Sequence, residues 1–131
     1  ILRYRPELSY APENVYWGKK TPYRRWNYLY FSPGFEKNIE KLLKAWKTLY
    51  EQKKVTSGFR IFSGFVGVEH QLYIFTTWAE DPLDFQNNMA KVIEILGDDG
   101  AAFWSETMTY VRVSETIEGW FLPQYSYVPE N

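Results

Sequence analysis

Short runs of apolar and aromatic residues along the chain predict four β-strands. The runs span residues 25–31, 58–66, 71–78 and 112–122. They are rich in the aromatic and β-branched side chains that fit a pleated sheet. Only residues 67–70 separate the second run from the third, and a loop this short requires antiparallel pairing. These two strands are therefore expected to form a hairpin.

A different spacing, with apolar residues three and four positions apart, predicts a long helix after the first strand. The apolar positions are Phe35, Ile39, Leu42, Leu43, Trp46, Leu49 and Tyr50. Charged residues occupy most positions between them, as expected for a helix with one buried face. Ser32 is suited to cap this helix and Pro33 to begin its first turn. Because Trp46 lies on the apolar stripe, it is expected to pack into the core.

The same spacing predicts a second helix that begins at Pro82. Asp81 is suited to cap it, and the Asp84 carboxylate favours the positive N-terminal end of a helix. Apolar residues follow at helical spacing at Phe85, Met89, Val92, Ile93 and Leu96. Residues 97–100, Gly-Asp-Asp-Gly, are expected to break this helix before a short helical piece over residues 101–110.

The predicted order is strand, helix, strand, strand, helix, strand. With two right-handed crossovers this order gives an α+β fold, the ferredoxin-like βαββαβ arrangement, in which a four-stranded antiparallel sheet carries both helices on one face. In the first strand, one face carries Trp26, Tyr28 and Tyr30 and the other carries Leu29 and Phe31. A sheet with one face in water would alternate with polar residues instead. A second sheet from another copy is therefore expected to cover the open face and complete an α/β barrel.

The two ends of the chain carry a repeated motif. Residues 6–14 read Pro-Glu-Leu-Ser-Tyr-Ala-Pro-Glu-Asn and residues 123–131 read Pro-Gln-Tyr-Ser-Tyr-Val-Pro-Glu-Asn, with six positions identical. Such a repeat indicates tandem copies of one unit, although loops rich in proline and tyrosine also match by coincidence. The sequence therefore divides into an extended N-terminal strap (residues 1–22), interpreted as the tail of a preceding copy, a domain over residues 23–122, and an extended tail over residues 123–131.

Composition narrows the classes of function. Lys and Arg total 15 against 16 for Asp and Glu, which argues against a nucleic-acid partner. The chain has no cysteine and a single histidine, His70, so no disulfide, thiolate nucleophile or His-rich metal site is expected. No apolar run approaches the ~20 residues of a membrane span, so a soluble protein without a membrane partner is expected. These features do not indicate a particular cellular compartment.

The sequence resembles the dimeric α/β-barrel superfamily over about residues 23–122. The resemblance lies in the element order, in Pro33-Gly34 before the long helix, and in Thr76-Thr77-Trp78 at the end of the third strand. The superfamily includes NIPSNAP-like proteins, stress-responsive barrel proteins and the cofactor-free monooxygenases of antibiotic biosynthesis. It implies two ferredoxin-like units whose sheets pack together, as a homodimer or a fused pair, with small molecules held between each sheet and its helices.

The haem-degrading branch of that superfamily permits a comparison residue by residue. Its catalytic asparagine, seven residues before the glycine that opens the helix, corresponds to Asn27, and its catalytic tryptophan at the end of the third strand corresponds to Trp78. Its haem-ligating histidine has no counterpart in residues 82–110, and His70 lies on the hairpin turn. Without an axial ligand haem iron is not held, so no cofactor is expected.

Two arginines interrupt otherwise apolar strands. Arg60 and Arg112 each need a partner if they are buried, either an internal carboxylate such as Glu115 or Glu118 or the carboxylate of a ligand. Tyrosines on the strands supply polar tips to an aromatic cavity. The predicted ligand-binding residues are Asn27, Tyr28, Tyr30, Arg60, Tyr73, Trp78 and Arg112. The candidates for catalysis are Asn27 and His70, although a turn position also fits a solvent-exposed histidine.

Three functions are compatible with these features. The leading hypothesis is a dimeric or tandem pseudo-dimeric barrel that binds a small aromatic or apolar molecule in the cavity between sheet and helices. The first alternative is a cofactor-independent monooxygenase or isomerase that acts on an aromatic or quinone-like substrate, with Asn27, Tyr28, Arg60 or His70 assisting proton movement. The second alternative is a carbohydrate-binding module, since exposed Trp and Tyr side chains offer flat stacking surfaces.

Overall fold

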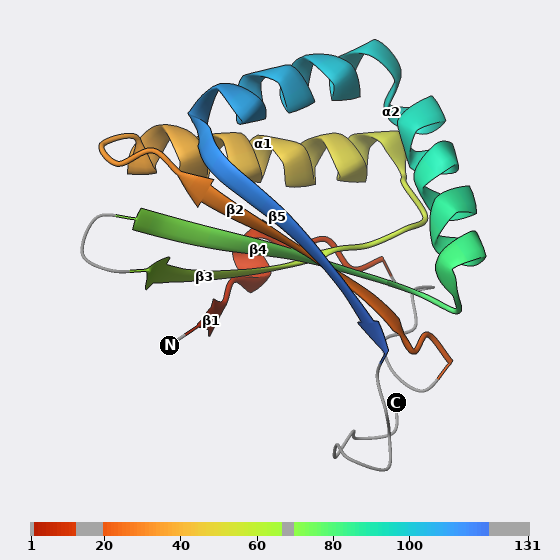
Figure 1. Ribbon diagram of the computed structural model, residues 1–131. Helices are drawn as coiled ribbons and strands as arrows, with labels where there is room; N and C mark the ends of the chain where they lie inside the picture. Colours follow the sequence, from red (N-terminus) through yellow and green to blue (C-terminus); the bar gives the residue numbers. More distant parts are fainter. Residues whose placement is uncertain (1, 13–19, 67–69, 121–131) are drawn as a thin grey trace.

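The computed structural model describes residues 2–12, 20–66 and 70–120 (Figure 1). Its elements are β1 (Arg3–Tyr4), the 3-10 turn η1 (Pro6–Leu8), β2 (Tyr23–Phe31), α1 (Glu36–Lys53), β3 (Arg60–Val66), β4 (His70–Ala79), α2 (Pro82–Tyr110) and β5 (Val111–Trp120). From β2 onward the order is strand, helix, strand, strand, helix, strand, so the predicted element order is confirmed. β3 and β4 pair as the predicted antiparallel hairpin.

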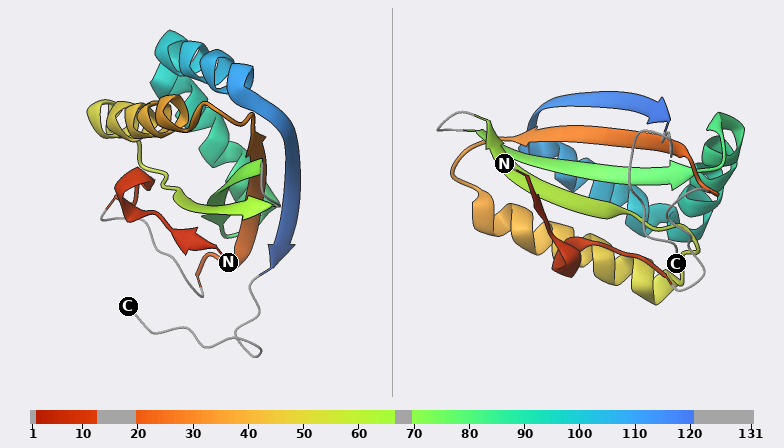
Figure 2. Two further views of the ribbon diagram at one scale, coloured as in Figure 1. Left: turned by 90° about the vertical axis from the view of Figure 1, so that its left-hand side faces the viewer. Right: turned by 90° about the horizontal axis from the view of Figure 1, so that it is seen from below.

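The strands of the described residues form one antiparallel sheet in the order β1-β3-β4-β2-β5. Both helices cover the same face of this sheet (Figure 2). The sequence predicts four strands, whereas the structure has five, because part of the N-terminal strap pairs with the outer edge of β3. Arg5 N–H donates to the Ile61 carbonyl at 2.8 Å, and an isolated bridge joins Tyr10 to Phe59. The strap also contains a 3-10 turn, which an extended segment would not.

The two helices begin differently from each other. Asp81 caps α2 as predicted, because its Oδ1 accepts the Asp84 N–H at 2.7 Å, and Asp84 Oδ2 in return accepts the Glu80 N–H at 2.9 Å. Ser32 does not cap α1, which begins at Glu36 after Phe35. The Ser32 N–H instead donates to the Tyr110 carbonyl at 2.9 Å, so Ser32 is held at the end of α2.

The predicted break lies inside α2, at Gly97, where two helical pieces meet at a kink. Gly97 leaves the helical region (φ 58°, ψ −142°) and kinks the helix, which then continues to Tyr110. Gly100 lies so close to Leu96 that a Cβ atom there would be 2.6 Å from the Leu96 Cβ. Beyond the kink, Trp46 Nε1 of α1 donates to Thr107 Oγ1 at 2.8 Å. Trp46 thus packs between the helices, and the kink turns the second half of α2 back toward β5 (Figure 1).

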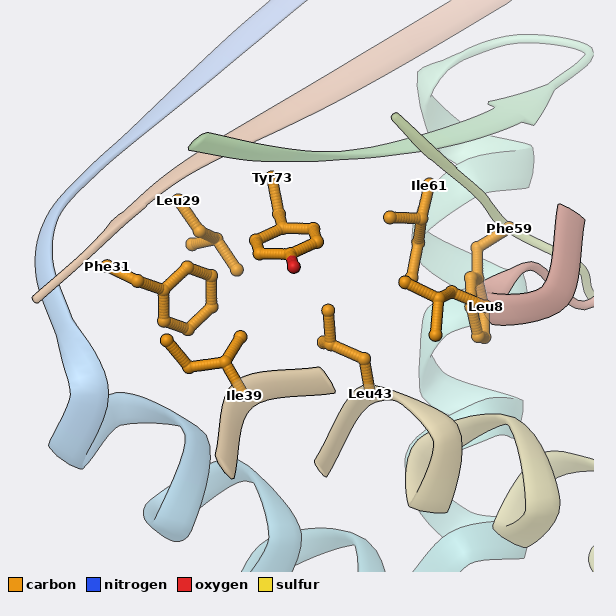
Figure 3. Packing of buried hydrophobic residues seen from close by; sticks show 8 residues of the cluster. All are labelled: Leu8, Leu29, Phe31, Ile39, Leu43, Phe59, Ile61 and Tyr73. Carbon is orange, nitrogen blue, oxygen red and sulfur yellow. The ribbon is translucent and has the colours of Figure 1, made fainter. Parts of the chain in front are cut away.

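The main hydrophobic core lies between the sheet and α1, with Leu8 of the strap closing one side (Figure 3). Its buried members are Leu8, Leu29, Phe31, Ile39, Leu43, Phe59, Ile61 and Tyr73. A second cluster joins α1 to the first half of α2 through Leu49, Val55, Val92 and Leu96. Neither helix in the described part of the chain is long and apolar enough to span a membrane.

Candidate functional site

The antiparallel register sorts the side chains of the sheet onto two faces. Tyr28 lies opposite Ile74 of β4 and Glu115 of β5, and Ile74 lies opposite Phe62 of β3. Directly paired residues project to the same side, so these side chains share the face away from the helices. Leu29, the next residue of β2, points into the core beneath α1. The predicted alternation is confirmed: each face of the sheet carries apolar or aromatic side chains.

We call the face away from the helices the open face. Its described members are Arg24, Trp26, Tyr28 and Tyr30 of β2, Arg60 and Phe62 of β3, Leu72, Ile74, Thr76 and Trp78 of β4, and Val113, Glu115 and Ile117 of β5. At its centre Leu72 and Ile74 are 6% and 3% exposed, whereas Val113 and Ile117 on the edge strand are 49% and 45% exposed. Two apolar side chains of β5 therefore face solvent on either side of Glu115.

One end of the open face carries two arginines beside an indole ring. The guanidinium carbon of Arg60 lies 6.0 Å from the centre of the Trp78 ring and 5.7 Å from that of Tyr4, within range of cation–π attraction. Arg24 is buried and donates to the carbonyls of Thr21 and Tyr23. Burial, together with the positive charge of Arg60, lowers the pKa of Arg24 to about 10. Two guanidinium groups thus lie close to each other and to the Trp78 ring at this end.

On the helix face, a polar network surrounds the hydroxyl of Tyr73. This hydroxyl donates to Glu40 Oε2 at 2.5 Å and accepts from Gln71 Nε2 at 2.8 Å. Arg5 of the strap donates to the other oxygen of Glu40 at 2.5 Å. Burial of the phenol and its hydrogen bond to Glu40 raise the pKa of Tyr73. Although desolvation opposes the change, hydrogen bonds to Glu7 and Glu40 raise the pKa of Arg5.

A small hollow lies between the end of β4 and the first turns of α2. Its volume is about 30 Å³, and its lining includes Tyr50, Phe59, Thr77, Phe85, Met89 and Val92. The lining is apolar and aromatic apart from a few polar atoms, as in small-molecule sites. One of these atoms, Thr77 Oγ1, is buried and has no hydrogen-bond partner among the described residues. The hollow has room for one or two water molecules in this conformation.

The predicted site residues do not converge on one pocket. By register Tyr28, Tyr30, Arg60 and Trp78 belong to the open face, whereas Asn27 and Tyr73 face the helices. Of the predicted residues, Trp78 also lines the hollow between β4 and α2. Asn27 Oδ1 accepts a 2.9 Å hydrogen bond from Thr116 Oγ1. Asn27 and Trp78, which resemble the catalytic pair of the haem-degrading branch, thus project to opposite sides of the sheet.

The remaining predicted residues lie at the margins of the sheet. Arg112 is the extra residue where the pairing of β5 with β2 shifts, and its side chain is exposed. Arg25, rather than Arg112, lies near Glu118, at 3.6 Å between Nε and Oε1. His70 begins β4 opposite Val66, but its side chain and the turn residues 67–69 lie outside the described residues.

Sequence reasoning missed Arg24 and Glu40. Arg24 precedes the predicted start of the first strand at residue 25, whereas β2 begins at Tyr23. Arg24 stands two residues before Trp26 and four before Tyr28, so the alternation of side chains along a strand would have placed it on the same face if the predicted strand had begun earlier. Glu40 is one of several charged residues around α1, and only the fold brings it to Tyr73. Among the described residues, no group of three His, Asp or Glu side chains is placed to hold a metal ion.

Comparison with solved structures connects this geometry to a known architecture. The chain matches a dimeric ferredoxin-like protein from an uncultured marine organism with a TM-score of 0.55, at 14% identity, over 85% of this chain and 94% of the other. The fold is ferredoxin-like. No protein-family model and no curated protein sequence matches the chain significantly. Since the ferredoxin-like fold hosts many unrelated functions, function has to be argued from the side chains.

Proposed function

We propose that the protein acts as a pair of ferredoxin-like units joined through their open faces, and that the pair binds a small aromatic or apolar molecule. The observation that carries the pairing is the exposure of Val113 and Ile117 on the open-face side of β5, where they flank Glu115 and continue the aromatic surface of β2. Two such faces packed together remove apolar area from water at roughly 25 cal/mol per Å². The dimeric ferredoxin-like neighbour supports a homodimer, and the resemblance to the dimeric α/β barrels implies pairing through the sheets.

The pairing is tested by charge substitutions on the two sides of β5. Val113→Lys places a charge on the open face, and Ser114→Lys places the same charge on the exposed opposite side. Analytical ultracentrifugation is expected to give a dimer for the wild type and Ser114→Lys and a monomer for Val113→Lys. A wild-type monomer at tens of micromolar, or equal effects of the two substitutions, would overturn the proposal.

The ligand site that we propose is the hollow between β4 and α2. Its aromatic lining offers stacking surfaces, and the unpartnered Thr77 Oγ1 offers a hydrogen bond to a polar substituent. A ring is larger than the present volume, so binding requires α2 to move away from β4. The kink at Gly97, which separates the two halves of α2, allows its first half to shift without displacing the second.

Ligand binding is tested with 1-naphthol as the probe. Val92 is 3% exposed and lines the hollow, whereas the adjacent Ile93 is 67% exposed. Val92→Phe is expected to fill the hollow and weaken 1-naphthol binding at least tenfold, while Ile93→Phe leaves it unchanged. Native mass spectrometry of the purified wild type reports any retained molecule and the assembly state together. An equal response of the two variants would count against this site.

The enzymatic alternative has less support, because its candidate residues lie on opposite faces of the sheet. Asn27 faces the helices with its amide oxygen bonded to Thr116, while Tyr28 and Arg60 lie on the open face. A carbohydrate-binding surface needs coplanar exposed rings. The exposed tryptophans in the described part, Trp104 on α2 and Trp120 at the end of β5, belong to different elements.

A further inference from the structure

Residues 3–12, the part of the N-terminal strap that the following paragraphs call the strap, bind the outer edge of β3. Tyr10 N–H donates to the Phe59 carbonyl at 3.0 Å, and Phe59 N–H donates back to the Tyr10 carbonyl at 2.8 Å. The views in Figure 2 place the strap beside β3 and α1. It thus occupies backbone groups that an unpaired edge strand leaves open to other chains.

Two side chains of the strap recognise this edge. Ser9 Oγ accepts the Ile61 N–H at 2.9 Å and donates to the Arg5 carbonyl at 2.8 Å. The Tyr10 hydroxyl donates to the Val55 carbonyl at 2.5 Å, and its ring packs at 5.5 Å from the ring of Tyr50. Ser9 and Tyr10 therefore fix where the strap lies along β3.

A glycine in the receiving strand region permits this close approach. A Cβ atom on Gly58 would lie 2.6 Å from the Tyr10 carbonyl oxygen and 3.1 Å from Pro12 Cδ. The receiving surface is thus shaped for a Ser-Tyr-x-Pro segment, with the proline ring over Gly58.

The same segment occurs a second time in the chain. Residues 123–131 carry Pro123, Ser126, Tyr127 and Pro129 at the spacing of Pro6, Ser9, Tyr10 and Pro12. All four residues of the first segment contact the unit on which it lies. Ser9 and Tyr10 bond to Ile61 and Val55, and Pro12 lies against Gly58. The Pro6 carbonyl accepts a hydrogen bond from Lys47 Nζ at 3.4 Å. Four contact positions of the strap are therefore shared by the second segment, which is the part of the repeat that supports shared binding.

We propose that residues 123–131 are a second strap, which docks on the β3 edge of another unit of this fold in the place that residues 6–12 occupy here. This docking is independent of the pairing of open faces. Four positions differ over this stretch. Leu8, fully buried in the core, corresponds to Tyr125, and Arg5, bonded to Glu40, corresponds to Leu122, while Glu7 and Ala11 correspond to Gln124 and Val128. The second strap therefore lacks the contacts that hold the first to its own unit, and it binds best where the resident strap is weakened.

The proposal is tested with a labelled peptide of residues 122–131 and the full chain carrying Ser9→Ala and Tyr10→Ala. The control peptide carries Ser126→Ala and Tyr127→Ala and keeps both prolines. Fluorescence anisotropy measures the binding. The native peptide is expected to bind the variant chain at least tenfold more tightly than the control peptide binds it. The native peptide is also expected to bind the variant chain at least tenfold more tightly than the wild-type chain.

A peptide of residues 3–12 serves as the reference occupant. If it binds the variant chain and the 122–131 peptide does not, the second segment is not a strap and the proposal is overturned. Equal binding of native and control peptides, or no binding of any peptide, overturns it as well. Should circular dichroism show that the double variant is unfolded, Ser9→Ala alone replaces it under the same criteria.

Discussion

The hydroxyl of Tyr73 donates a 2.5 Å hydrogen bond to Oε2 of Glu40 and so connects the centre of β4 to α1. The other oxygen of Glu40 accepts from Arg5, so strap, helix and sheet meet at one carboxylate. Tyr73 is fully buried, whereas the Glu40 side chain that accepts its hydrogen bond is 29% exposed. The network therefore contributes to stability as well as to the position of the strap.

Tyr73→Phe is expected to lower the free energy of unfolding by about 2 kcal/mol, because it removes a buried hydrogen bond to a charged group and keeps the ring. The matched control is Tyr28→Phe, since the Tyr28 hydroxyl makes no hydrogen bond among the described residues; it should change stability by less than about 0.5 kcal/mol. Urea denaturation measures both. Similar effects of the two substitutions would show that the Glu40 contact contributes little.

Tyr50 makes stability depend on pH in the alkaline range. Burial, and to a lesser degree the nearby Tyr10, raises the pKa of Tyr50 from 10.0 to about 12. Between these values the unfolded chain loses a proton that the folded protein keeps, so the stabilisation is complete below pH 10 and is lost as pH rises toward 12. The slope approaches about 1.4 kcal/mol per pH unit.

Tyr50→Phe should remove the part of this slope that Tyr50 contributes, while Tyr73, whose pKa is also raised, keeps its own. Denaturation at a series of pH values from 6 to 12 compares the variant with the wild type. The difference in stability is expected to be constant up to pH 9 and to shrink above pH 10. A constant difference up to pH 12 would contradict the assignment to Tyr50.

Gly97→Ala is expected to destabilise the protein by about 1–3 kcal/mol, because the backbone there (φ 58°, ψ −142°) is one that side chains disfavour. Open space around Gly97 means that the cost comes from the backbone rather than from a collision. The control is Asp98→Ala at the adjacent exposed position, which should change stability by less than about 0.5 kcal/mol. Thermal unfolding, followed by circular dichroism, measures the stability of both variants. A Gly97→Ala variant as stable as the wild type would show that the backbone at Gly97 is not strained.

Gly58→Ala should loosen the strap, because its Cβ would lie 2.6 Å from the Tyr10 carbonyl oxygen. Overpacking of this kind costs about 1–3 kcal/mol. Hydrogen exchange is expected to quicken at the amides of Tyr10 and Phe59, while α2 amides keep their protection. Ser57→Ala is the control and should leave exchange at Tyr10 unchanged. Uniform acceleration throughout the chain would indicate global destabilisation instead of strap release.

Local patterns in the sequence predict much of the fold. The Asp81 cap and the hairpin of β3 and β4 depend on residues that are neighbours in the chain, and both predictions are confirmed. The Ser32 cap was wrong because α1 begins only at Glu36, after Phe35. Ser32 instead bonds through its N–H to Tyr110, at the far end of α2, a contact that no local pattern predicts. The candidate site was harder to predict, since a strand position specifies a face only after the register is known.

The sequence by itself determined the order of the elements, the two apolar faces of the sheet and the repeated terminal motif, because each is a periodicity or identity along the chain. Only the tertiary structure decided that the strap adds β1 to the edge of β3, that Asn27 and Trp78 project to opposite sides, and that Glu40 reaches Tyr73. These relationships join residues far apart in sequence. They arise when backbone hydrogen bonds and buried side chains have to be satisfied together in three dimensions.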